Sequence, residues 1–164
     1  MAANIVELRS SFGPRVELLR LNNVNARETS LLTPDKFNQM IAAAKIGTYI
    51  APAAAFLLAF EEGDDYDGGH FKWFQGRYDK FLYIDRVVVG EGHRRLGFGR
   101  LLYEDLFGRA RMIGHTRLAC EVNKEPPNPV SDRFHESLGF AEVATDVIDG
   151  GAKIVRYLIR LLPD

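Results

Sequence analysis

One apolar run, residues 81–89, most constrains how this chain can fold. It reads Phe-Leu-Tyr-Ile-Asp-Arg-Val-Val-Val, and such a nearly continuous run is typical of a central strand that is covered on both faces. Gly90 and Gly92 end the run in a turn, and a second pair, Gly97 and Gly99, precedes a segment with apolar residues at helical spacing. The sequence therefore predicts a buried strand, a glycine-marked turn and a helix, in that order.

The other elements are predicted from apolar periodicity and from the positions of Gly and Pro. Thr33 and Pro34 begin a helix within a helical region at 15–44, and Asn128 caps a later one. Residues 61–80 are interpreted as a long polar and aromatic loop. Strands are expected at 4–9, 47–51, 54–60, 117–123, 141–149 and 153–161. This order predicts an α/β fold with a mixed, mostly antiparallel sheet flanked by helices.

The composition excludes several classes of protein. A chain of 164 residues fits one domain, here residues 1–164, and its net charge of −1 argues against binding nucleic acid. The most apolar stretch, residues 50–60, is too short to cross a bilayer, and the first residues lack the pattern of a signal peptide. The single cysteine, Cys120, fits a reducing compartment. We therefore expect a cytoplasmic protein without nucleic-acid, membrane or metal partners.

The turn after the central strand has the chemistry of a diphosphate site. Gly97 and Gly99 let the backbone approach a ligand closely, and the free N–H groups of the helix start favour an anion. Arg94 and Arg95 add positive charge. A Walker A loop is excluded because its lysine and hydroxyl residue are missing, and a Rossmann fingerprint is excluded because Arg95 stands where its third glycine belongs.

The pattern that fits is Arg-x-x-Gly-x-Gly, followed by Asn123 and by a segment at 128–140 that closes in Gly-Phe. Over residues 81–140 the chain resembles the GNAT superfamily of N-acetyltransferases. The resemblance implies the GNAT fold, with splayed central strands, and acetyl-CoA as cosubstrate. The residues that it implies for cofactor binding are Val87, Val89, Arg94, Arg95, Leu96, Gly97, Phe98, Gly99, Arg100, Asn123, Ser131 and Phe134.

The resemblance also suggests catalytic roles. The N–H of Val89 would stabilise the oxyanion, and Asp85 would accept a proton from the amine, with Glu121 as a second candidate. Many relatives carry a tyrosine as general acid four residues before the closing glycine, where this chain has His135. Histidine can donate a proton near neutral pH, but a thiolate also leaves without a protein acid. A structural ion pair for Asp85 is the other interpretation of that residue.

The acceptor is expected to be a primary amine of a small molecule or peptide. In this family the first helical region and nearby loops usually wall the acceptor side. The residues expected there are Asn25, Glu28, Trp73, Phe74 and Tyr78. A non-catalytic CoA-binding sensor or partner module of the same fold is the alternative function, and a homodimer is compatible with either.

Overall fold

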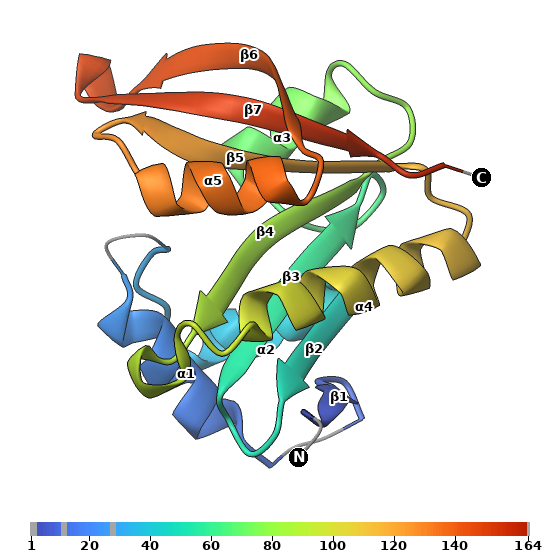
Figure 1. The fold of residues 1–164 in the computed structure, drawn as a ribbon, viewed down its shortest axis with the longest axis vertical. Helices are drawn as coiled ribbons and strands as arrows, with labels where there is room; N and C mark the ends of the chain where they lie inside the picture. Colours follow the sequence, from blue (N-terminus) through green and yellow to red (C-terminus); the bar gives the residue numbers. More distant parts are fainter. Residues whose placement is uncertain (1–2, 11–12, 27–28, 164) are drawn as a thin grey trace.

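A computed structural model describes residues 3–10, 13–26 and 29–163 of the chain. Its centre is a seven-stranded sheet in the order β1-β2-β3-β4-β5-β7-β6, which is antiparallel except for the pair β4–β5 (Figure 1). The strands are β1 Ile5–Glu7, β2 Ile46–Ile50, β3 Ala55–Glu61, β4 Leu82–Val89, β5 Arg117–Glu125, β6 Ala141–Ile148 and β7 Lys153–Leu161. The predicted fold class, a mostly antiparallel sheet flanked by helices, is confirmed.

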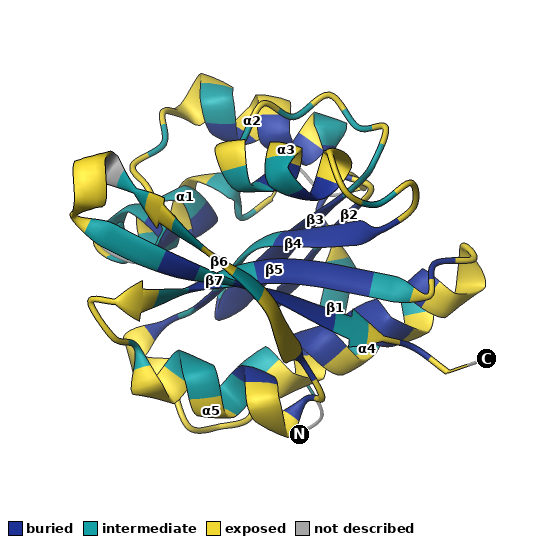
Figure 2. Cartoon of the chain, turned by 90° about the horizontal axis from the view of Figure 1, so that it is seen from above, coloured by how far each residue is buried: buried dark blue, intermediate teal, exposed yellow. Residues whose placement is uncertain are grey.

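Helices cover both faces of this sheet. Figure 2 shows α1 (Arg15–Val24), α2 (Pro34–Ala43) and α3 (Gly69–Gln75) on one face, with α4 (Phe98–Met112) and α5 (Pro129–Ser137) on the other. We call these the α1–α3 face and the α4–α5 face. Two of the predicted helix starts are confirmed, because Thr33 Oγ1 accepts from the N–H of Lys36 and Asn128 Oδ1 accepts from the N–H of Ser131.

The parallel strands β4 and β5 are paired only where they begin. Leu82 pairs with Leu118 and Tyr83 with Ala119, and beyond this point the two strands diverge (Figure 1). We call the diverging segments, residues 84–89 of β4 and 120–125 of β5, the splay. The expected splayed central strands are therefore present, and β4 has an unpaired edge along its second half.

A β-bulge in β4 decides which side chains face which helices. Leu58 pairs with Arg86 and Ala59 pairs with Ile84, so Asp85 is the extra residue of the bulge. Tyr83 and Val88 both pack among the side chains of the α1–α3 face, whereas Val87 and Val89 pack on the α4–α5 face. The extra residue reverses the alternation, which brings Asp85 and Arg86 onto the same face.

Two details of the sequence interpretation are wrong. The segment 61–80 contains the helix α3, whose Phe71 and Phe74 are fully buried against the sheet, instead of being loop throughout. The apolar spacing of α5 also predicts that Val130 belongs to the core, but Val130 is 70% exposed, and the buried positions are His135 and the C-cap Leu138. Burial in these short helices is set by what lies beneath them, which apolar spacing alone does not show.

Candidate functional site

The turn between β4 and α4 has an unusual backbone. Gly90 closes the strand, a single 3-10 turn follows at Glu91–His93, and two residues then adopt left-handed conformations, Arg95 with φ 66° and Gly97 with φ 80°. Gly97 is the N-cap of α4 and, within the described part of the chain, no side chain caps it. The first N–H groups of α4 therefore point out of an exposed turn without a side-chain acceptor, which suits an anion.

The arginine side chains of this turn are exposed, and two of them bond to neighbouring side chains. Arg94 donates to Asn25 Oδ1 at 2.7 Å, and Arg100 lies 3.7 Å from Glu104 and donates to Ser137 Oγ at 2.8 Å. Arg95 and Leu96 are exposed, the latter by 60%. We call residues 94–100 the cradle, since they combine free N–H groups with three arginines.

Gly99 is where the cradle meets the rest of the predicted cofactor site. A Cβ at this position would lie 3.3 Å from Phe134 Cζ and 3.9 Å from Val89 Cγ2. The start of α4, the α5 residue Phe134 and the end of β4 therefore converge at this point. Only a residue without a side chain leaves the Phe134 ring in its place.

The backbone of β4 offers hydrogen-bonding groups along the splay. Gly90 N–H donates to the carbonyl of Ala54 on β3, and the groups of an antiparallel strand alternate between its two edges. By this alternation Val88 bonds to β3, while Val87 and Val89 direct their N–H and C=O groups toward the other edge, where β5 has diverged. An extended ligand can therefore pair with β4 as a strand would.

The β5 and α5 residues of the predicted cofactor site are divided between the two faces. Asn123 is half-buried and shares its alternation with Ala119 and Glu121, which places it on the α1–α3 face. Ser131 lies in the first turn of α5, where Asn128 caps it and its Oγ is 3.2 Å from His135 Nδ1. Phe134, on the same helix, is half-buried beside the cradle.

His135 is buried between α5 and α4, and both of its ring nitrogens are engaged. Nδ1 is 2.8 Å from the carbonyl of Ser131, which can only accept, so Nδ1 carries the hydrogen. Nε2 therefore accepts from the Tyr103 hydroxyl at 2.7 Å. Burial lowers the pKa of His135 and keeps the ring neutral. His135 therefore lies in the core between the two helices, and its acid role stays a prediction.

Asp85, the predicted base, lies on the α1–α3 face in a closed network. One of its oxygens accepts from the Tyr66 hydroxyl and the other from Arg86 Nε at 2.6 Å. Arg86 also donates to Asn22 Oδ1 at 2.9 Å, which ties the pair to α1. The structure thus shows the ion pair between Asp85 and Arg86, which strand alternation alone argues against, and its cause is the bulge.

Glu121 lies on the same face as Asp85, on the other side of the splay, and its donors are neutral groups. Its Oε2 accepts from the Tyr83 hydroxyl at 2.6 Å, and its cross-strand neighbour is Tyr157 on β7. Burial is the largest cause that raises the pKa of Glu121, to about 8; the hydrogen bond from Tyr83 lowers it and the negative charge of Asp85 raises it. Such a carboxyl group can take up a proton near neutral pH.

The five predicted acceptor residues do not form one group. Trp73 lies on the α1–α3 face, stacked on Tyr157 with ring centroids 4.0 Å apart, and Phe74 beside it is fully buried. Tyr78 lies under the guanidinium of Arg117 at the paired end of β4 and β5, away from the splay. Asn25 contacts the cradle through Arg94, and Glu28 lies outside the described residues.

Several residues of the α1–α3 face escaped the sequence interpretation. Tyr66, Tyr83 and Tyr157 each place a hydroxyl against a carboxylate. Tyr83 could have been found, because residues two apart on a strand point to the same face and Tyr83 is two residues before Asp85. Tyr66 comes from an irregular segment without any periodic signal.

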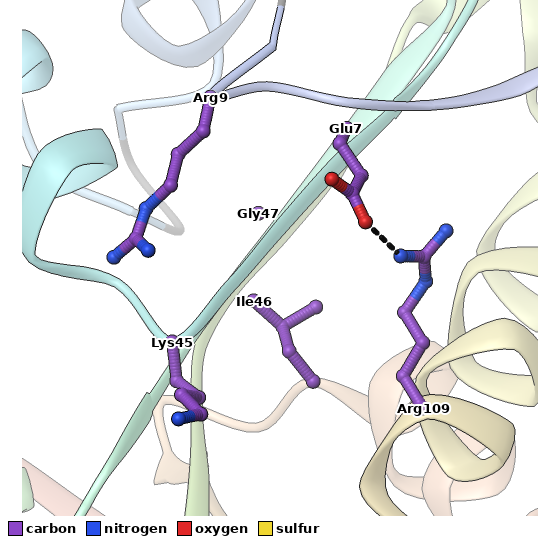
Figure 3. Close-up of a pocket in the computed structure, with 6 residues that line it drawn as sticks. All are labelled: Glu7, Arg9, Lys45, Ile46, Gly47 and Arg109. Atoms are coloured by element: carbon purple, nitrogen blue, oxygen red, sulfur yellow. Dashed lines mark hydrogen bonds and ion pairs between the residues drawn. The ribbon is translucent and has the colours of Figure 1, made fainter. Parts of the chain in front are cut away.

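A hollow of about 110 Å³ lies at the other end of α4, away from the cradle (Figure 3). Its three cations have partners: Arg109 pairs with Glu7 at 2.6 Å, Lys45 pairs with Glu61 at 3.2 Å, and Arg9 donates to the carbonyls of Ala42 and Ala44. Close to it, the donor atoms of Glu61, Glu62 and His115 lie within 4.8 Å of one another, a spacing that a metal ion could use. The hollow lies beside β1 and β2, and the three donor residues lie at the end of β3 and before β5, so neither feature belongs to the splay.

Comparisons with known proteins fit this geometry. A sequence model of the acetyltransferase (GNAT) family matches residues 21–140. Among curated proteins, no sequence matches this chain. Ard1 from Thermoplasma volcanium has a similar structure, with a TM-score of 0.75, 15% identity and coverage of 100% of both chains.

Two further solved structures are similar. The ribosomal-protein-S18-alanine N-acetyltransferase from Escherichia coli has a TM-score of 0.70 and 16% identity, over 99% of this chain and 96% of that one. An aminoglycoside 6'-N-acetyltransferase complexed with coenzyme A has a TM-score of 0.72 and 13% identity, over 98% of each chain.

Identities this low show a shared fold, and the family match adds the sequence pattern. That match covers more than half of the chain and includes the cradle, the splay and α5. No helix in the described part of the chain is long and apolar enough to cross a membrane. The chain therefore belongs to the acetyltransferase (GNAT) family.

Proposed function

We propose that this protein transfers the acetyl group of acetyl-CoA to a primary amine of a small molecule or peptide. The observation that carries the proposal is the coincidence, at one end of the sheet, of a cradle with free N–H groups and an unpaired edge of β4. Two structurally similar proteins are named for N-acetylation, one of alanine on a ribosomal protein and one of an aminoglycoside, so the fold serves both acceptor classes.

The residues present fit acetyl-CoA. The left-handed backbone at Arg95 and Gly97 turns the N–H groups of the α4 start outward, where they would hold the pyrophosphate with the cradle arginines. The backbone of Val87 and Val89 would pair with the pantetheine arm, and Phe134 would pack beside it. When bound there, acetyl-CoA supplies the thioester carbonyl that the amine attacks.

The chain's own catalytic groups have separate tasks. The Val89 N–H, directed to the open edge, would stabilise the charge that develops on the thioester oxygen. Glu121 would accept the amine proton, in place of Asp85, because both oxygens of Asp85 already accept strong hydrogen bonds. A CoA thiolate leaves tolerably without an acid, since a thiol has a pKa of about 8.5. His135 as acid is the alternative, which kinetics of its variants decide.

The test begins with binding. Acetyl-CoA and CoA at about millimolar concentration should raise the melting temperature, because a ligand that binds only the folded state stabilises it. ATP and NAD should leave it unchanged. Gly99→Val, which would displace Phe134, should abolish the acetyl-CoA effect, whereas Gly92→Ala should keep it, because a Cβ at Gly92 meets nothing within 4 Å. A shift by ATP or NAD alone would overturn the proposal.

Turnover then separates the enzyme from its alternative. CoA release is measured against a panel of amino acids, aminoglycosides and peptides with free N-termini, at pH 7 to 9. Release with at least one amine, together with mass-spectrometric detection of the acetylated product, supports catalysis. Binding without release across the panel would favour the non-catalytic CoA-binding sensor, a function that the cradle alone would also serve.

A further inference from the structure

Two carboxyl groups lie on opposite sides of the splay, and they differ in the kind of group that donates hydrogen bonds to them. Asp85 comes from the bulge of β4 and Glu121 from β5, and strand alternation places both on the α1–α3 face. The side chains of Asp85 and Arg86 are only 6% and 7% exposed. Both oxygens of Asp85 accept hydrogen bonds, one of them from the guanidinium of Arg86, which is its ion-pair partner. Glu121 accepts instead from two neutral groups, the Tyr83 hydroxyl and its own backbone N–H.

We infer that Asp85, through the negative charge of its carboxylate, is a positioning residue for Glu121: it strengthens the Glu121 carboxylate as an acceptor for the proton of the amine. This inference rests on the proposed function of Glu121, and it gives the buried ion pair between Asp85 and Arg86 a role in that function. The pair has no need to touch substrate, because it acts on the proton affinity of its neighbour through space.

The groups around Glu121 allow this effect. On β4 they are Tyr83, Asp85 and Arg86, on β7 Tyr157, and before α3 Tyr66. Cys120 adjoins Glu121 on β5, and Tyr103 lies on α4; burial keeps both protonated by raising their pKa values. Among these groups, the ion pair of Asp85 and Arg86 therefore supplies the charges that act on Glu121.

Arg86 offsets part of the charge of Asp85 without cancelling it at Glu121. Its guanidinium bonds to Asn22 on α1, so it is held toward that helix. The negative charge of Asp85 raises the pKa of Glu121 and the positive charge of Arg86 lowers it, the effect of Asp85 being the larger of the two. When the surroundings of two neighbouring carboxyl groups give them different proton affinities, one can stay charged while the other accepts a proton. This arrangement recurs in enzymes.

The experiment reads Glu121 directly. In protein labelled with ¹³C at glutamate carboxyl groups, without acetyl-CoA, the Glu121 signal is titrated from pH 4 to 10 and assigned by its loss in Glu121→Gln. We expect a midpoint near 8. Asp85→Asn should lower it by about one unit, a tenfold loss of proton affinity, because a like charge is removed. A midpoint near 4.5 in the unaltered protein, or an unchanged one in Asp85→Asn, would overturn the inference.

Two further variants separate charge from structure. Asp85→Glu keeps the charge and should keep the midpoint within a few tenths of a unit. Tyr66→Phe removes a hydroxyl that bonds to Asp85 but leaves its charge, so it should do the same. If Tyr66→Phe moves the midpoint as far as Asp85→Asn does, packing and not charge sets it, and the inference falls.

The pH dependence of the reaction rate tests whether this proton affinity matters for catalysis. The logarithm of kcat/KM should rise with pH through the Glu121 midpoint, and Asp85→Asn should move that rise to lower pH by the same amount. The titration needs no turnover, so the two proposals can fail separately. A protein that acetylates no amine can still show the shift, and one that acetylates amines without the shift refutes only the role given to Asp85.

Discussion

The replacement His135→Ala should cost stability far more than catalysis. The imidazole is buried in contact with the rings of Tyr103, Phe134 and Phe140. Without it the hydroxyl of Tyr103, a residue that is 1% exposed, loses its acceptor, which costs about 1–3 kcal/mol. Lost packing and the remaining cavity add about 1–2 kcal/mol. We expect a loss of roughly 3 kcal/mol, which for a domain of this size lowers the melting temperature by about 6–12 °C.

The measurement combines calorimetric melting with saturation kinetics below the melting transition. kcat should fall by less than about tenfold, because a neutral ring that accepts from Tyr103 has no proton to give from Nε2. The control is His135→Gln, whose amide oxygen can accept from Tyr103 and should recover about half of the lost stability. A kcat loss of about 10²-fold or more with little change in melting temperature would refute this reasoning and restore His135 as the general acid.

The stability should also depend on pH through His135. Burial lowers its pKa in the folded protein, so the unfolded chain binds the proton more tightly. The stabilisation is therefore complete above the unfolded value of about 6.5 and is lost as the pH falls toward the lower, folded value. The melting temperature should fall more between pH 7.5 and 5.5 in the unaltered protein than in His135→Gln.

Two other substitutions test the surroundings of the site. Trp73→Ala removes the ring that stacks on Tyr157, the cross-strand neighbour of Glu121. The variant should have a higher KM for the acceptor amine and a nearly unchanged KM for acetyl-CoA. Equal effects on both constants would show that Trp73 has only a structural role. Gly108 is exposed inside α4, and a Cβ there meets nothing within 4 Å, so Gly108→Ala should stabilise the fold by about 0.5–1 kcal/mol with unaltered kinetics, as chemical denaturation would show. A destabilised Gly108→Ala would mean that the helix is not regular at that point.

Features that depend only on residues close together in the sequence were predictable from the sequence alone. The central strand expected at 81–89 is β4 at Leu82–Val89, and the helix expected after Gly97 begins at Phe98. The cradle followed from glycine positions and charge, because left-handed backbone and free N–H groups are local consequences of residue type. The caps Thr33 and Asn128 were found for the same reason.

The catalytic arrangement was decided by tertiary structure. Regular alternation would place Asp85 with Val87 and Val89, but a bulge is set by pairing with β3, and it turns Asp85 to the other face beside Arg86. His135 likewise occupies the sequence position of a family acid, yet Tyr103, 32 residues earlier, takes its free nitrogen. Which group holds a proton depends on the charges and donors that the fold brings to it, and these come from segments distant in the sequence.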